Sequence, residues 1–159
     1  LDLSDSELDL LSWAAEGSPG KARQIHESNL LPLFQETDEL LNDREKYEDE
    51  NILDVLLLAE ELAQIKDGLP LFLNMLKLKI RDELVALNLK RSKEGVVVVK
   101  TDGSLKDWSY EQLFAKLQSI DEASAKLRRN CNRALVCEIL LFSLQQINWN
   151  KKKENLIDV

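Results

Sequence analysis

The sequence predicts an all-α protein, a helical bundle preceded by two shorter helices, and three observations carry that prediction. Leu, Glu, Lys and Ala abound among the 159 residues, whereas there are only five glycines and three prolines; this bias favours helices over strands. Apolar residues recur at intervals of three and four along several stretches, which is the helical period. Capping boxes stand ahead of two of those stretches. With 44% hydrophobic and 31% charged residues, the chain has the composition of a folded domain.

The N-terminal residues predict a short helix that ends at a tight break. Ser4 and Glu7 form a capping box ahead of an apolar stretch, which places the helix start there. Gly17 is expected to end this helix, because glycine tolerates the backbone conformations that follow a helix.

A second helix is predicted directly after the break. Ser18 is a good N-cap, and Pro19 fits the first helical position, where no amide hydrogen is needed. We expect this helix to run toward Leu30 and to break or kink at Pro32.

The middle of the chain predicts two further helices after an acidic connection. Residues 36–50 hold eight acidic residues against two basic ones, which indicates a solvated helix or linker and a domain boundary. Residues 51–63 follow the helical period, Gly68 ends that helix and Pro70 opens the next. Residues 70–90 are apolar on most sides, so we expect that helix to lie centrally and to be buried.

The C-terminal half begins with a change of pattern. Four valines ahead of Asp102 and Gly103 predict a short β-hairpin near residues 96–107. Ser109 and Gln112 then form a capping box that opens another helix. The apolar residues on the predicted buried face of that helix are Tyr110, Leu113, Phe114, Leu117 and Ile120.

A last, long helix is predicted over residues 121–146, and residues 151–159 are expected to form a flexible tail. The inner stripe of this helix is predicted to comprise Ala123, Leu127, Cys131, Ala134, Leu135, Glu138, Leu141 and Phe142.

Five polar residues in that last helix are candidates for contact with a partner. Lys126, Arg129 and Arg133 share a face at positions i, i+3 and i+7, which indicates either a solvated surface or an interface. Asn130 and Asn132 lie among apolar residues although asparagine has weak helix preference. They are therefore either exposed, or residues that fix packing or a subunit contact.

The composition excludes several classes of function. A net charge of −8 argues against a domain whose main task is to grip phosphate backbones, and indicates either solubility or an acidic partner surface. Cys131 and Cys137 are expected to be reduced thiols on one helix, pointing to different sides. No signal-like or membrane-spanning segment occurs, so we expect no membrane association and a cytoplasmic location. Because the chain starts at Leu1, we expect it to be a piece of a longer protein.

Enzyme signatures are absent from the sequence. There is no phosphate loop, no dinucleotide-binding glycine turn and no zinc-protease motif. His26 is the only histidine and has no nucleophile at helical spacing, so we interpret it as a surface residue. We therefore expect no catalysis, no cofactor and no metal site.

Two stretches resemble the δ′-type clamp-loader subunits of bacterial DNA polymerase III. The first is the helix break, which is similar to the start of the sensor-2 helix in an AAA+ lid and consists of Gly17, Ser18, Pro19, Gly20 and Lys21 after Glu16. The second is similar to the C-terminal helix of those subunits, where an Asn-x-Asn-x-x-Leu run leads into a leucine-rich end. It comprises Ile120, Asp121, Glu122, Ala123, Leu127, Asn130, Asn132, Leu135, Glu138, Leu140 and Leu141.

The resemblance implies an organisation and a function. Residues 1–40 would be the later part of an AAA+ lid, and residues 45–150 the helical collar, an oligomerisation domain. The collar would pack against δ and γ/τ subunits in a pentameric ring that loads the sliding clamp onto primed DNA. DNA and the clamp would then be only indirect partners of this chain.

One position distinguishes between members of that group. ATP-hydrolysing relatives place a sensor-2 arginine where Gly20 stands here, so the resemblance implies a poor phosphate sensor, as in the non-hydrolysing δ′ type. Lys21 or Arg23 reaching a nucleotide would instead indicate a γ/τ-like, ATP-hydrolysing subunit. A third alternative is an unrelated helical adaptor that binds a partner helix through a leucine-rich surface.

Overall fold

The structure is a computed structural model that describes residues 3–42, 52–92 and 108–157. Within these ranges every regular element is helical, which confirms the predicted all-α class. The elements are α1 Asp5–Ala15, α2 Pro19–Glu27, α3 Leu30–Asn42, α4 Ile52–Gln64, the 3-10 helix η2 Lys66–Gly68, α5 Leu69–Ser92, α6 Tyr110–Arg128 and α7 Arg133–Ile157. The β-hairpin predicted near 96–107 lies outside the described residues.

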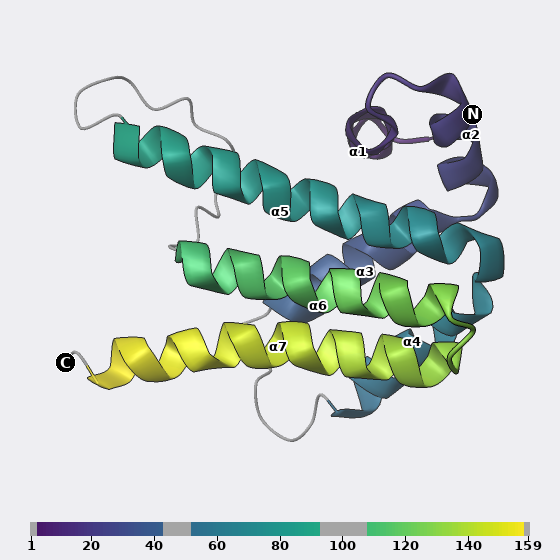
Figure 1. The fold of residues 1–159 in the computed structure, drawn as a ribbon. Coiled ribbons are helices and arrows are strands. Elements are labelled where there is room, and N and C mark those ends of the chain that lie inside the picture. The colour runs from purple at the N-terminus through teal and green to yellow at the C-terminus, as the bar shows by residue number, and fades with distance from the viewer. Residues whose placement is uncertain (1–2, 43–51, 93–107, 158–159) are drawn as a thin grey trace.

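The long helices form one layer of the molecule. Helix α6 lies between α5 and α7 and packs against both, while α7 also packs against α4 (Figure 1). Helix α3 contacts α4, α5 and α7 from behind that layer. The short helices α1 and α2 pack on each other and against α3, and α1 reaches the middle of α5 at Arg81 and Asp82. The described part of the chain thus consists of a five-helix bundle with a helical pair attached (Figure 1).

The core lies between that layer and the helices behind it, and α5, α7 and α4 contribute most of its buried apolar side chains. Phe72, Leu73 and Met75 of α5 are buried, as are Leu113 of α6 and Leu141 of α7. Packing large apolar side chains in this way is the main source of stability in a helical bundle. The prediction of a central, buried helix over residues 70–90 is thus confirmed for its first half; farther along, Val85 and Leu89 are half exposed.

The N-terminal capping predictions are confirmed. The Ser4 hydroxyl accepts a hydrogen bond from the Glu7 amide at 3.3 Å, and the Glu7 carboxylate accepts one from the Ser4 amide at 2.8 Å. Ser18 caps α2, and Pro19 occupies its first position. Between the helices Gly17 has a φ of 79°, a left-handed conformation that glycine adopts without steric cost.

The predicted end of the second helix is wrong. Helix α2 stops at Glu27, and Asn29 takes a left-handed conformation with a φ of 51°. Asparagine is one of the few residues that adopts this geometry readily, so it ends a helix as glycine would. Pro32 neither breaks nor kinks α2, because it lies in the first turn of α3, where amide hydrogens have no intrahelical partner.

The capping box of α6 is confirmed, whereas the predicted division of the C-terminal half is wrong. The Ser109 hydroxyl accepts from the Gln112 amide at 3.2 Å. Helix α6 continues to Arg128, and α7 begins at Arg133 and runs to Ile157, through most of the segment expected to be a tail. No single helix spans 121–146, because the chain turns at residues 129–132.

That turn also changes which side chains face inward. Leu135 was expected on the inner stripe but is 52% exposed, and Phe114 was expected on a buried face but is 59% exposed. A four-residue interruption rotates the helical phase, so a stripe extrapolated across it selects the wrong face at Leu135. Phe114 lies before the turn, and it is exposed because it is not on the face of α6 that packs against α5 and α7. Leu113, Ile120, Ala123 and Leu141 are buried as predicted.

Candidate functional site

The predicted sensor-2-like turn lies at the surface between α1 and α2. Gly20 is exposed, and a Cβ added there would meet only the Ser18 hydroxyl at 3.9 Å. Packing therefore does not require a glycine at position 20. Lys21 directs its ammonium group back to Glu16, with Nζ 3.0 Å from Oε2.

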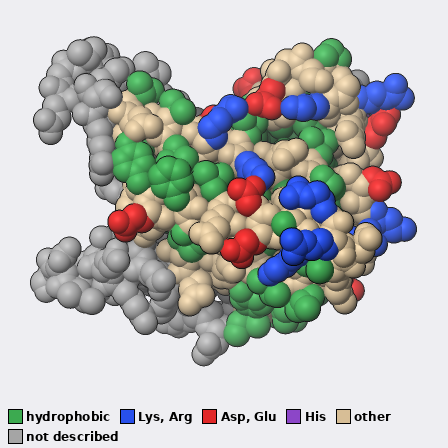
Figure 2. All heavy atoms as spheres, in the orientation of Figure 1, with side chains coloured by type: hydrophobic (Ala, Val, Ile, Leu, Met, Phe, Trp, Pro, Cys, Tyr) green, Lys and Arg blue, Asp and Glu red, His purple; other side chains and the backbone are tan. Residues whose placement is uncertain are grey.

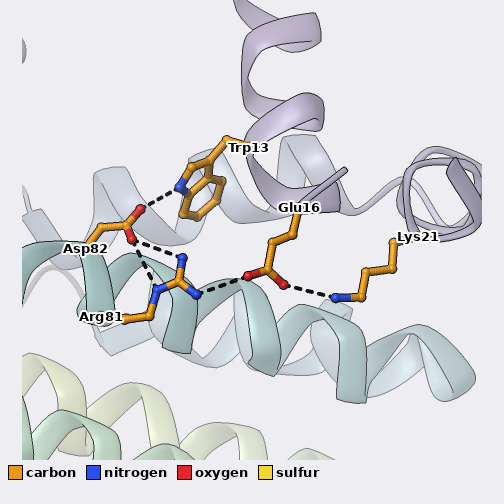
Figure 3. A network of polar contacts seen from close by, with 5 residues as sticks. All are labelled: Trp13, Glu16, Lys21, Arg81 and Asp82. Carbon is orange, nitrogen blue, oxygen red and sulfur yellow. Dashed lines mark hydrogen bonds and ion pairs between the residues drawn. The ribbon is translucent and has the colours of Figure 1, made fainter. Parts of the chain in front are cut away.

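Glu16 and Trp13 connect this turn to the bundle through a chain of polar contacts (Figure 3). The second carboxylate oxygen of Glu16 accepts a hydrogen bond from Arg81 Nη1 of α5 at 3.1 Å. Arg81 also pairs with its neighbour Asp82 at 3.3 Å. Asp82 Oδ2 in turn accepts from the indole Nε1 of Trp13 at 2.7 Å. The contacts thus join residues that are far apart in the sequence.

The charges in this network reinforce one another. Hydrogen bonds from Lys21, and then from Arg81, lower the pKa of the Glu16 carboxyl below its ordinary value of 4.5. The bond to Glu16 likewise raises the pKa of Arg81. Beneath the network, the Trp13 ring lies 5.6 Å from that of Phe34, which lies 6.3 Å from that of Phe72. The helical pair therefore packs on the bundle through apolar side chains, including the Trp13 ring, and this polar network lies at the border of the contact.

A groove of about 1030 Å³ opens at the other functional candidate, the α6–α7 turn. Its walls come from the end of α4, the start of α5 and the turn itself. Of the five predicted contact residues, Asn130, Asn132 and Arg133 line this groove, whereas Lys126 and Arg129 do not belong to its lining. The lining residues are Glu60, Ala63, Gln64, Lys66, Leu69, Pro70, Leu73, Asn74, Lys77, Ser124, Leu127, Arg128, Asn130, Cys131, Asn132, Arg133 and Ala134.

The two asparagines have structural tasks in that turn. Asn130 has a φ of 58°, a conformation that asparagine accepts more readily than most residues. The Asn132 side-chain oxygen accepts from the Leu135 amide at 3.2 Å and so caps the start of α7. Both are exposed, so neither is a buried register-fixing residue. The predicted stripe of three cations on one helix face does not exist either, because Arg129 is the C-cap of α6 whereas Arg133 begins α7.

The groove is basic although the chain as a whole is acidic. Four cations line it against the single carboxylate of Glu60, and one of the four, Lys77, forms an ion pair with Asp121. Figure 2 shows Lys and Arg side chains over the half of the bundle that carries the α6–α7 turn, close to a hydrophobic patch at the lower edge. Acidic side chains lie among them on this face, so the excess of positive charge is a property of the groove lining itself.

Sequence reasoning missed a set of exposed apolar residues on α4 and α7. Leu53 and Leu57 of α4 are 63% and 52% exposed, and Leu135 and Ile139 of α7 are also exposed. Each pair is spaced i, i+4 on one of two helices that pack against each other. The sequence could have indicated them, because residues 52–58 are apolar on nearly every side of the helix. One face packed against the core does not need that many apolar residues.

The remaining chemical candidates are isolated. Cys131 lies exposed in the turn, not on one helix with Cys137 as predicted. Burial raises the pKa of the Cys137 thiol to about 11, which leaves it protonated and unreactive. His26 is exposed on α2.

Across the ranges the structure covers, no three His, Cys, Asp or Glu side chains gather as metal ligands. Among the described helices, none has the length and apolar character to cross a lipid bilayer.

Comparison with models of protein families, with curated proteins and with solved structures found no match for this chain.

Proposed function

We propose that this chain is a non-catalytic assembly module of a bacterial DNA polymerase III clamp loader, of the δ′ type, acting in the cytoplasm. In this proposal α1 and α2 are the end of an AAA+ lid, and the bundle is the collar that holds the subunit in a ring with δ and γ/τ. The proposal rests on the two stretches of sequence resemblance described above. Neither a cofactor nor a metal is part of it.

The observation that carries the proposal is the attachment of the sensor-2-like turn to the bundle. Lys21 directly follows Gly20, the position where ATP-hydrolysing relatives have the sensor-2 arginine. It is paired with Glu16, which is itself bound by Arg81 of α5. Arg23 is paired with Glu27 at 2.7 Å. Both cations that an ATP-using relative would direct at phosphate are thus engaged within the chain. A lid tied to its collar suits a subunit that stays fixed while its neighbours move.

The α6–α7 turn agrees with the same proposal. The Asn-x-Asn run has a defined geometry here, with Asn130 in the left-handed conformation and Asn132 as the cap of α7. The leucine-rich helix that follows presents Leu135 and Ile139 outward. An exposed apolar pair beside a polar turn is typical of a surface that meets another subunit.

The test is native mass spectrometry of this chain mixed with the δ and γ/τ collar regions from the same source. We expect a defined hetero-complex, and we expect Leu135→Ser combined with Ile139→Ser to abolish it. The matched control is Val85→Ser with Leu89→Ser, which makes the same apolar-to-polar change at two equally exposed positions of α5.

A chain that stays alone at micromolar concentration would contradict the clamp-loader proposal. The exposed leucines of α4 and α7 would then favour the second candidate, a helical adaptor that binds a partner helix. ATP-dependent protection of α2 against hydrogen exchange would instead support a γ/τ-like, ATP-hydrolysing subunit, because it requires Lys21 or Arg23 to leave its present partner.

A further inference from the structure

Three of the four cations that line the groove at the α6–α7 turn form no ion pair within the described part of the chain. The three are Lys66, Arg128 and Arg133. In a chain with eight more acidic than basic residues, cations are outnumbered by available partners. Three that remain unpaired around one groove therefore mark a place where negative charge from outside is favoured.

The rest of the lining combines apolar surface with amide groups. Leu69, Leu73 and Leu127 contribute apolar atoms, while Asn74 and Asn130 contribute side-chain amides that donate and accept hydrogen bonds. A polypeptide presents the complementary set: apolar side chains, a polar backbone and carboxylates.

The size and charge of the groove favour a polypeptide over other anions. About 1030 Å³ lies at the upper limit of small-molecule pockets, which span about 300–1,000 Å³. A nucleic-acid strand is disfavoured, because it is held by many phosphate contacts, and this chain carries a net charge of −8. Leucines in the lining would also gain nothing from a phosphate backbone.

We propose that this groove binds an acidic, leucine-containing segment of a partner protein. The carboxylates of that segment would pair with the three free cations, and its apolar side chains would cover the leucines of the lining. Leu57 lies one turn before Glu60 on α4, and Leu135 directly follows Ala134 on α7, so the segment would continue from the groove onto these two exposed residues. This inference rests on the proposed function only for the identity of the partner, a neighbouring ring subunit.

The experiment measures binding by fluorescence anisotropy with the full chain. The probe is a fluorescein-labelled amphipathic peptide built from Glu, Leu and Ala. Its controls are the same peptide with Lys in place of every Glu, and a single-stranded oligothymidine of equal formal charge. We expect saturable binding of the acidic peptide that weakens as salt is raised, and no saturable binding of the lysine peptide.

Matched variants locate the site. Arg128→Gln with Arg133→Gln removes two lining charges and is expected to weaken peptide binding about tenfold. Arg23→Gln with Lys126→Gln removes the same charge from positions outside the lining and is expected to leave binding unchanged. All four side chains lie at or near the surface, so circular dichroism should show unchanged folding.

Three results would overturn the inference: no binding of the acidic peptide, equal binding by both double variants, or tighter binding of the oligothymidine at the same residues. The last would assign the groove to nucleic acid. A failure here is distinguishable from a failure of the proposed function. Peptide binding without a clamp-loader hetero-complex contradicts only the proposed function, whereas a hetero-complex without peptide binding contradicts only this inference.

Discussion

The helical pair α1–α2 contributes far fewer buried apolar side chains to the core than the bundle α3–α7, and its contact with α5 is largely polar. In the bundle, α6 is packed between α5 and α7, and side chains such as Phe72 and Leu141 are fully buried. The pair contributes Leu11, Ala14 and Ile25 to the core, but it reaches α5 through the half-buried Trp13 and the polar network around Glu16 (Figure 3).

This difference predicts that the two regions respond to different conditions. Burial of apolar area is insensitive to salt and to mild acid, whereas exposed ion pairs contribute little and are screened. The bundle should therefore persist where the pair loosens, as local opening concentrates in regions with few buried contacts. Under the proposed function, the collar would be the permanent part and the lid attachment the adjustable part.

The largest effect is expected from truncating the bundle core. Phe72→Ala should lower the free energy of unfolding by about 3–5 kcal/mol, because it leaves a cavity where α5 meets Phe34. Urea denaturation followed by circular dichroism measures this value. The matched control is Phe114→Ala on the exposed face of α6, which should change it by less than about 0.5 kcal/mol. Equal losses would show that the assignment of faces is wrong.

A smaller effect, confined to the helical pair, is expected from Trp13→Ala. Loss of the Phe34 contact and of the Asp82 hydrogen bond should cost about 2 kcal/mol, less than a fully buried aromatic residue. Hydrogen exchange should accelerate in α1 and α2 and stay unchanged in α6 and α7. Trp13→Phe keeps a ring and loses only the hydrogen bond, so its effect should be smaller. Uniform acceleration along the chain would contradict separate stabilities.

The α6–α7 turn should respond to backbone conformation. Asn130→Ala is expected to lower the free energy of unfolding by about 1 kcal/mol, since alanine is strained at a φ of 58°. Asn130→Gly removes the same side chain without that strain and should be neutral or stabilising. Thermal denaturation of the two variants distinguishes them. Similar losses in both would mean that the asparagine side chain, not its backbone, is what matters.

The smallest effect is expected from protonation of Glu16. Its pKa is lowered in the folded chain by Lys21 and Arg81, so the stabilisation is present above the ordinary value of 4.5 and is lost as the pH falls below it. Protection factors, which correct for the intrinsic exchange rate at each pH, should therefore decrease slightly in α1 and α2 in mild acid and at high salt. Glu16→Gln should show that lower protection already at neutral pH, with a weaker acid response. An acid response unchanged in Glu16→Gln would assign it to another carboxyl, such as Glu7.

Much of the fold could be predicted from local signals. Ser4, Ser18 and Ser109 cap the helices where their hydrogen bonding predicts, and the first helix ends just before Gly17, with Glu16 as its C-cap. Such signals act over one helical turn and depend little on the rest of the chain. The two wrongly predicted helix ends have a common cause. Asn29 and Asn130 end helices in the left-handed conformation. Because asparagine also occurs within helices, its presence in the sequence does not by itself indicate a helix end.

The candidate sites were predictable only in part. The turn at 17–21 and the residues Asn130, Asn132 and Arg133 were found from sequence, but their partners were not. Glu16 and Arg81 are 65 positions apart, and no periodicity relates them. The groove likewise needs α4, α5 and the α6–α7 turn together.

The sequence by itself determined the helical class, the capped helix starts and the apolar stretches that form the core, because these follow from the intrinsic preferences of neighbouring residues. Only the tertiary structure decided that Leu135 faces outward, that Lys21 is held by Glu16 and that four cations, three of them without an ion pair among the described residues, line one groove. The physical reason is that exposure and electrostatic pairing depend on distances between helices, which packing of the whole bundle sets.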